Sequence, residues 1–371
     1  MQRRLQNKIA ESTWTLPIVS VFVALCWLLP FGHRWEEPVG LGVCVLTTYV
    51  LLELNTANAL LRVRSRMVSV VYLLLVCLCG WLHVFNLTCL AALCIVLSFY
   101  TLFQTYEQVE AVFPTFHAYL FIALASLVWP PLLWLALIQW WNQTIFLRSM
   151  SWRGLWAAIL GAFTPYFFWS CAVLTVTFVI PFLPGIQVES LSVPTWLGMP
   201  QLLSHLHGIV GHPVQFVHTI QAGQVPLADV WLGLNQELVD ADRDVLVVLQ
   251  AHTPWLMSHL YKLCVTAYAG LLGLTGFVHY LRKNYDDRIS VRMCHYSFLL
   301  MESAVCVWML LSPGAYSELF PLLLLLMAPS VAHFFTLTRT WLTNAWFVLC
   351  TLAWVALLLF PFYYPIVSAN P

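Results

Sequence analysis

Eleven apolar segments occupy most of this 371-residue chain, and they constrain its fold more than any other feature. A helix needs about 20 mostly apolar residues to cross the hydrocarbon core of a bilayer. The candidate spans are 14–30, 38–53, 67–85, 87–103, 113–129, 131–147, 155–183, 256–281, 293–312, 318–336 and 342–366. The sequence therefore predicts an all-α, polytopic bundle of transmembrane helices with about 11 spans.

The composition agrees with a chain that meets lipid over most of its surface. Hydrophobic residues make up 61% of the sequence and charged residues 9%, and the mean hydropathy is +0.82. Soluble domains carry roughly 25% charged residues, so this chain cannot cover a water-exposed surface. The 18 Trp and 14 Tyr residues fit a membrane protein, because their rings settle at the headgroup level. The net charge of zero predicts no nucleic-acid partner.

The basic residues between the segments predict an orientation. Lys and Arg collect in cytoplasmic loops. With a cytoplasmic N-terminus, 11 spans place 13 of the 16 basic residues on that side, namely Arg3, Arg4, Lys8, Arg62, Arg64, Arg66, Arg148, Arg153, Arg282, Lys283, Arg288, Arg292 and Arg339. Arg34 and Arg243 fall outside, and Lys262 falls within a span. The C-terminus is then external. Segment 155–183 is either one kinked helix or two short ones.

The predicted topology divides the chain into three parts. Residues 1–183 form a membrane bundle with spans one to seven, and residues 256–371 form a second with spans eight to eleven. Between them, residues 184–255 form one long external loop. Its stretches 195–221 and 227–250 are too polar to span, and we expect them to be amphipathic helices at the outer interface.

Four histidines gather in this loop, at His205, His207, His212 and His218. His207 and His218 are eleven residues apart, about three helical turns, so one helix would place them on one face. Pro213 prevents a single helix through all four. The i, i+4 spacing typical of a metal site is absent, and we expect neither a metal nor a cofactor. Two interpretations stay open: interfacial histidines, or a catalytic His207 with substrate-binding neighbours.

Two carboxylates, Glu36 and Glu37, follow the first span beside Arg34. A carboxylate at the interface can take a proton from an acceptor hydroxyl while a lipid donor lies in the bilayer. This position is similar to that of the catalytic base in polytopic glycosyltransferases that use lipid-phosphate sugar donors. The resemblance implies a membrane-lipid substrate, a polyprenyl-phosphate-linked sugar, whose phosphate meets Arg34. A solvated hairpin is the alternative interpretation.

Intramembrane charges form the third group of candidates. A charge in the apolar region costs at least a few kcal/mol, so it needs a partner or a water-filled cavity. Lys262 lies near the end of its span and can extend its ammonium group to the interface. Glu302 lies mid-span; it is either functional or a neutral, hydrogen-bonded group, with Lys262 or His333 as candidate partners. The basic residues of 62–66 either anchor a helix end at anionic lipid or bind a phosphorylated headgroup.

Several stretches carry a resemblance to a known family: Glu53–Asn58, Ala125–Pro131, Ser151–Gly154, Phe163–Phe167 and Glu318–Pro321. On these motifs the chain resembles an uncharacterised multi-pass inner-membrane family of Bacteroidetes. The resemblance implies a bacterial inner (plasma) membrane, with the periplasm outside. Some members carry a carotenoid-oxygenase label, but this sequence lacks the four-His iron set on a β-propeller that such an activity requires.

Three classes of function follow. The leading hypothesis is an inner-membrane protein of the cell envelope, glycosyltransferase-like, that serves glycan assembly with a lipid-linked sugar at the periplasmic face. Glu36 or Glu37 would be its base, assisted by His207. The second class is a transporter or flippase with Glu302 and Lys262 along its pathway. The third is a non-enzymatic scaffold of an envelope complex.

Overall fold

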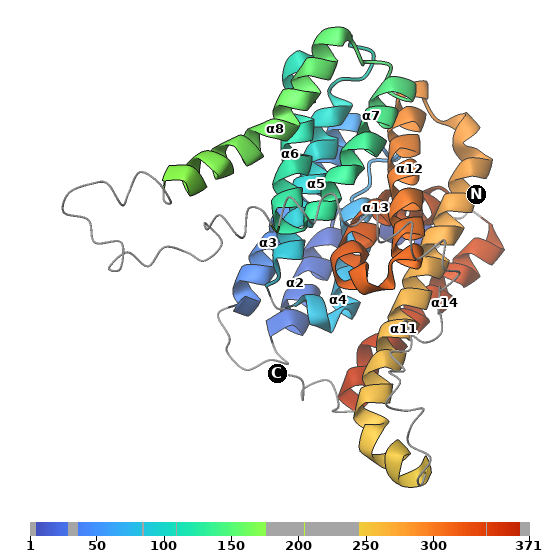
Figure 1. The fold of residues 1–371 in the computed structure, drawn as a ribbon. Coiled ribbons are helices and arrows are strands. Elements are labelled where there is room, and N and C mark those ends of the chain that lie inside the picture. Colours follow the sequence, from blue (N-terminus) through green and yellow to red (C-terminus); the bar gives the residue numbers. More distant parts are fainter. Residues whose placement is uncertain are drawn as a thin grey trace. The chain divides into compact units, whose positions relative to one another are not determined.

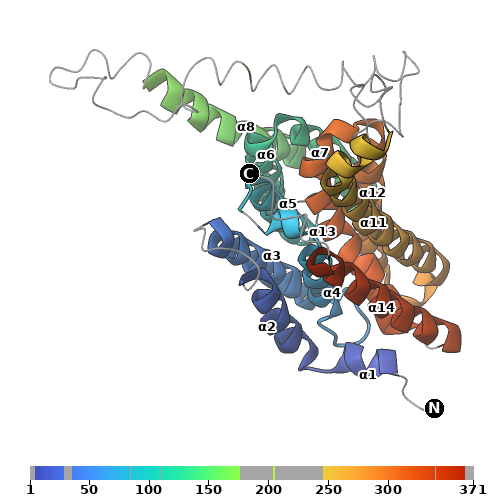
Figure 2. The same cartoon turned by 90° about the horizontal axis from the view of Figure 1, so that it is seen from below.

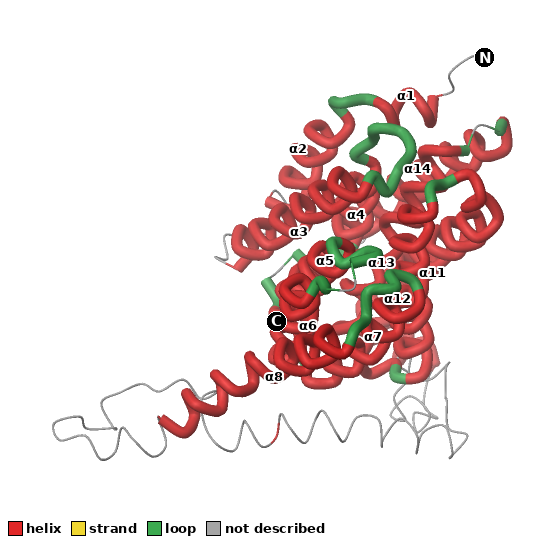
Figure 3. Tube along the Cα trace, turned by 90° about the horizontal axis from the view of Figure 1, so that it is seen from above, coloured by secondary structure: helices red, strands yellow, loops and turns green. Residues whose placement is uncertain are grey.

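The computed structural model describes residues 5–28, 36–83, 85–108, 110–175, 204, 245–338 and 340–363 (Figure 1). Every regular element within these ranges is a helix, and Figure 3 shows the helices joined by short loops, with no strand among the described residues. The prediction of an all-α fold is confirmed.

The chain separates into two compact units, which are described in turn. Unit 1 comprises residues 1–89 and 225–371, and unit 2 comprises residues 90–224. The α-helices of unit 1 are α1 (Leu5–Glu11), α2 (Thr15–Leu28), α3 (Glu36–Asn58), α4 (Met67–Leu78), α11 (Val245–Lys283), α12 (Ile289–Leu311), α13 (Tyr316–Leu337) and α14 (Trp341–Tyr363). Three short 3-10 helices join them: η1 (Gly80–Leu82), η8 (Asn284–Asp286) and η9 (Pro313–Ala315). Unit 2 contains most of α5 (Leu87–Phe103), with α6 (Val112–Val128), η2 (Pro130–Trp134), α7 (Leu135–Ile145) and α8 (Trp152–Leu174).

The helices coincide with the predicted apolar segments, but they differ in length. Within the described residues, six are long and apolar enough to cross a membrane: Glu37–Asn58, Trp152–Leu174, Tyr261–Asp286, Ile289–Leu311, Tyr316–Leu337 and Trp341–Phe360. Four further apolar helices have 10–17 residues. The chain thus has the helices of a membrane protein, whereas the count of 11 spans stays a prediction. The predicted external loop lies outside the described residues, except for Ser204 and the first part of α11, which begins at Val245.

Helix α13 forms the core of unit 1. Figures 1 and 2 show it among the other helices, and it contacts α1, α4, α11 and α12. Every residue from Leu319 to Thr336 is buried, as in a helix with neighbours on all sides. Two interior prolines, Pro321 and Pro329, are tolerated because the surrounding helices bury this backbone.

Glycines let α11 approach α13 closely. A Cβ atom on Gly276 would lie 2.8 Å from the backbone carbon of Ser330 and 2.8 Å from the nitrogen of Val331. Small residues at such contacts are the usual device of membrane helices, which associate through packing rather than through the hydrophobic effect. Gly276 therefore sets the distance between these two helices.

Unit 2 is organised around the packing of α6 against α8. The N-terminus of α8 is capped by Ser151, whose hydroxyl accepts a hydrogen bond from the Gly154 amide at 3.1 Å. Gly161 of α8 packs against the carbonyl of Phe116, which leaves no room for a side chain. The helix continues through Pro165 to Leu174, so this part of segment 155–183 is one helix.

Candidate functional site

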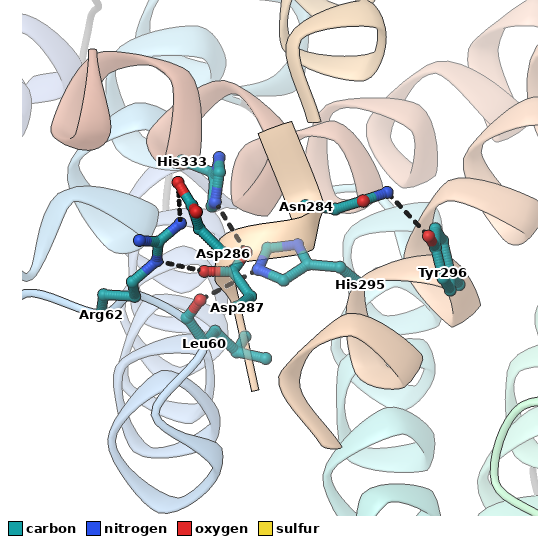
Figure 4. Close-up of polar contacts among 8 residues, drawn as sticks. All are labelled: Leu60, Arg62, Asn284, Asp286, Asp287, His295, Tyr296 and His333. Carbon is teal, nitrogen blue, oxygen red and sulfur yellow. Dashed lines mark hydrogen bonds and ion pairs between the residues drawn. The ribbon is translucent and has the colours of Figure 1, made fainter. Parts of the chain in front are cut away.

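A buried carboxylate, Asp287, joins three parts of unit 1 at the end where α11 gives way to α12 (Figure 4). The Arg62 guanidinium, from the loop between α3 and α4, donates from Nε to Asp287 Oδ1 at 2.5 Å. His333 of α13 donates from Nε2 to Asp287 Oδ2 at 3.1 Å, since a carboxylate can only accept. A second contact joins Arg62 Nη2 to Asp286 Oδ2 at 3.5 Å. We call Arg62, Asp287, His333 and their neighbour His295 the polar centre.

His295 of α12 ties the same loop to the helices. Its Nε2 atom donates to the carbonyl of Leu60 at 3.0 Å (Figure 4). The Tyr280 ring of α11 stacks on His295 with centroids 4.4 Å apart and meets His333 edge-on at 4.8 Å. All three rings are fully buried. The polar centre therefore fastens loop 59–66 to α11, α12 and α13 at once.

Opposing effects set the charge of Asp287. Burial alone would raise the pKa of its carboxyl group, but the hydrogen bonds from His333 and Arg62 outweigh burial and lower the pKa below its ordinary value. For Arg62, burial works against the charged form, yet the bond to Asp287 raises the pKa of the guanidinium. The pair is therefore ionised at neutral pH.

This shift predicts a pH dependence of stability. A carboxyl group with a lowered folded pKa binds fewer protons in the folded state, so its contribution is complete above the ordinary value of 3.8. This contribution to stability is lost as the pH falls through the lowered pKa that Asp287 has in the folded protein. We expect the difference in unfolding temperature between the wild type and Asp287→Asn to be constant from pH 7 to about 5 and to shrink toward pH 3. A difference that grows on acidification would contradict this.

The polar centre also has unused polar atoms. Among the described residues, Nδ1 of His295, Nδ1 of His333 and the hydroxyl of Tyr280 have no hydrogen-bond partner. No group of three His, Cys, Asp or Glu side chains in the described ranges could hold a metal ion. What the arrangement offers is a buried ion pair with two imidazole rings beside it.

The second feature of unit 1 is an apolar cavity of about 380 Å³. Its walls come mainly from α4 and α14, with two residues each from α2 and α11 and one each from α1 and α13. Almost every lining side chain is apolar; Thr15, Thr351 and Tyr268 are the polar exceptions. A volume of this size lies within the range of about 300–1,000 Å³ usual for small-molecule sites.

The cavity opens along α14. Four of its lining residues on this helix are exposed, namely Val348, Thr351, Leu352 and Val355, and Leu352 is exposed to 64%. The surrounding surface is apolar too, with Ile18 of α2 and Leu349 of α14 exposed nearby along their helices. An exposed apolar face on helices of this kind is the face that meets lipid. The cavity therefore opens onto an apolar surface.

The structure places the two predicted intramembrane charges apart. Glu302 is buried in α12, with Oε2 at 3.4 Å from the Ser330 hydroxyl and Oε1 beside Gly273. Lys262 is exposed, and its ammonium group lies 5.8 Å from the centre of the Trp81 ring. Glu302 thus pairs with neither Lys262 nor His333, and it does not line the apolar cavity.

Of the predicted external site, only the beginning of α3 is described. This helix begins at Glu36, so both acids lie in its first turn, where the helix dipole favours negative charge. The Glu37 side chain is buried, and its carbonyl accepts a hydrogen bond from Trp27 Nε1 at 3.2 Å. The role of Glu36 or Glu37 as a catalytic base stays a prediction. Arg34 and the histidines at 205, 207, 212 and 218 lie outside the described residues.

Sequence reasoning did not single out the polar centre or the cavity. The visible signal for the polar centre was a pair of acids, Asp286 and Asp287, in a short loop otherwise rich in basic residues. The cavity has no sequence signal, because its lining residues look like any other apolar residues of a span.

Compared with known proteins, the chain matches no protein-family model, no curated protein and no solved structure.

Proposed function

We propose that this chain is a multi-pass membrane protein that binds the hydrocarbon chain of a membrane lipid in the apolar cavity of unit 1. The observation that carries the proposal is the cavity itself: about 380 Å³, lined almost entirely by apolar side chains and open along the exposed face of α14. An apolar cavity does not hold water, because water needs polar partners, and it accepts apolar molecules instead. In a bilayer, the apolar molecules at hand are lipid chains.

The proposal includes an orientation. Hydrogen bonds gather α1, loop 59–66, loop 284–288 and Thr338 at one end of unit 1, through Ser65 to Ala10, Arg62 to Asp287 and Asn7 to Thr338. The described basic residues of this end are Lys8, Arg62, Arg64, Arg66, Arg282, Lys283, Arg288 and Arg292. The positive-inside rule favours this end as the cytoplasmic one, in a bacterial inner membrane. The polar centre would then lie near the cytoplasmic surface.

The lipid-binding proposal keeps one part of the sugar-transfer hypothesis, namely its lipid-linked ligand. A polyprenyl-phosphate-linked sugar has the long apolar chain that the cavity would take, and it stays a member of the proposed ligand class. The transfer step itself stays a prediction, because it depends on Arg34 and His207, which lie outside the described residues.

Blocking the cavity tests the proposal. Thr351 and Val19 line it from α14 and α2, so the large side chain in Thr351→Trp or Val19→Trp would reduce its volume. We expect each variant to keep its fold and to retain far less lipid through purification, about tenfold less, measured by native mass spectrometry of the detergent-solubilised protein.

Two control variants separate the effect of filling the cavity from the effect of adding a Trp side chain to the same helices. Leu349→Trp and Leu25→Trp place the same ring on exposed positions of the same two helices, outside the cavity. They should retain lipid like the wild type. Equal retention by all four variants would contradict lipid binding in the cavity.

A further inference from the structure

Glu302 places a carboxyl group between three packed helices of unit 1. The residue is only 6% exposed, and its helix α12 is long and apolar enough to cross a membrane. A Cβ atom on Gly273 of α11 would lie 3.3 Å from Oε1 of Glu302 and 3.6 Å from Cε of Met327 of α13. The other carboxyl oxygen, Oε2, lies 3.4 Å from the hydroxyl of Ser330, also of α13. The carboxyl group is therefore at the interface of α11, α12 and α13.

No cation compensates a charge at this position. Among the residues that the structure describes, no Lys, Arg or His side chain forms a hydrogen bond or an ion pair with Glu302. The groups that face it from α11 and α13, at Gly273, Met327 and Ser330, are not titratable. The titratable group that interacts with it is the Cys306 thiol, one turn farther along α12. A buried carboxylate without a partner costs several kcal/mol, and binding a proton removes that cost.

The hydrogen atoms around Ser330 lead to the same conclusion. A serine hydroxyl has one hydrogen atom to donate. The Ser330 hydroxyl lies 2.8 Å from the carbonyl oxygen of Met327, where that hydrogen makes the shorter of its two contacts. The longer contact, to Glu302 at 3.4 Å, then needs a hydrogen atom on the carboxyl group, because a carboxylate can only accept. A protonated Glu302 can donate to the free lone pair of the Ser330 oxygen.

A proton fits this site better than a metal cation does. A hard cation requires several oxygen ligands, whereas the carboxyl group faces one hydroxyl on one side and Gly273 and Met327 on the other. No group of three His, Cys, Asp or Glu side chains in the described part of the chain could hold a metal ion. A proton needs only one base and one acceptor, and both are present.

We infer that Glu302 is a proton-binding site within the membrane-spanning helices, which holds its proton at neutral pH and donates it to Ser330. Neither residue lines the apolar cavity, so this site is independent of lipid binding. Loss of the proton leaves a negative charge between α11, α12 and α13. Binding of the proton therefore favours the close packing of these three helices. Ionisable groups inside a membrane commonly serve proteins that take up or pass on protons.

Infrared spectroscopy of the purified full-length protein in nanodiscs tests the inference directly. The C=O bond of a protonated carboxyl group absorbs at a higher frequency than the C–O bonds of a carboxylate. At neutral pH, the spectrum of the wild type minus that of Glu302→Gln should contain one band of a protonated carboxylic acid. A difference spectrum that contains carboxylate bands instead would overturn the inference.

Two serine variants test the hydrogen bond without changing the carboxyl group. Ser330→Ala removes the acceptor, so the carboxylic acid band should move to higher frequency. Ser303→Ala is the matched control, because the Ser303 hydroxyl also donates within its own helix, to the carbonyl of Leu300 at 2.8 Å. It should leave the band where it is in the wild type. The same band position in Ser330→Ala and the wild type would show that Ser330 is not the acceptor.

The pH dependence of stability gives a second readout. The folded protein keeps a proton on Glu302 that the unfolded chain releases at neutral pH, so stability falls as the pH rises. From about pH 5 to 8, the unfolding equilibrium of the wild type should shift toward the unfolded state relative to Glu302→Gln, by up to about tenfold per pH unit. A difference that is constant, or that shifts in favour of the folded wild type as the pH rises, would show an ionised Glu302 and overturn the inference.

Discussion

Replacing Asp287 by Ala should lower the free energy of unfolding by about 3 kcal/mol. The change leaves the guanidinium of Arg62 without its closest partner and His333 Nε2 buried without an acceptor. Removing one member of a buried ion pair costs about 3–5 kcal/mol, and the lower end applies because Arg62 is 39% exposed and water can solvate it. The readout is chemical unfolding in detergent micelles.

The neighbouring residue provides the matched control. Asp286 also faces Arg62, but at 3.5 Å and with a side chain that is 49% exposed. Exposed ion pairs contribute about 0–1 kcal/mol, so Asp286→Ala should have a small effect. Similar losses in the two variants would show that the polar centre does not hold the loops together.

A side chain at Gly276 should separate α11 from α13 and disrupt unit 1. Gly276→Ala places a methyl group against the backbone of Ser330 and Val331, which cannot move without the whole of α13. Overpacking of this kind costs about 1–3 kcal/mol for a small group. Gly276→Leu adds three more carbons in the same place, and we expect it to prevent accumulation of folded protein in the membrane.

Gly270 lies on the same helix, and we expect its replacement by Ala not to destabilise the protein. A Cβ atom there meets nothing within 4 Å, so Gly270→Ala introduces no clash. Alanine is favoured over glycine in helix interiors by about 1 kcal/mol, and the variant should be as stable as the wild type or more so. Melting temperatures in micelles measure both variants. Equal destabilisation of Gly270→Ala and Gly276→Ala would contradict the close packing of α11 on α13.

The helices of this chain could be predicted because a span is a local property. An apolar run of sufficient length is visible without knowledge of its neighbours, so the predicted segments 293–312 and 318–336 agree with α12 and α13 to within four residues. The start of α11 at Val245 was not predicted as part of a span. Its first residues are apolar, but they lie in stretch 227–250, which the sequence analysis expects to be an amphipathic helix at the interface.

The candidate sites are formed by contacts between helices. The sequence pointed to some of their residues but not to the contacts between them. Arg62 and Asp287 are 225 residues apart, so no local pattern reports their contact. His333 was considered as a partner for Glu302, but Ser330 takes that place, one helical turn away on the same helix. The residues 62–66 were predicted to meet anionic lipid. The structure adds that Arg62 is already paired with Asp287.

The most direct test of the lipid-binding account is an experimental density map of the protein in nanodiscs that contain phosphatidylglycerol and phosphatidylcholine. The account predicts an elongated density between α2, α4 and α14, entering past Leu352. A cavity closed by the side chains of Phe347 and Trp354, with no lipid density between the helices, would contradict it.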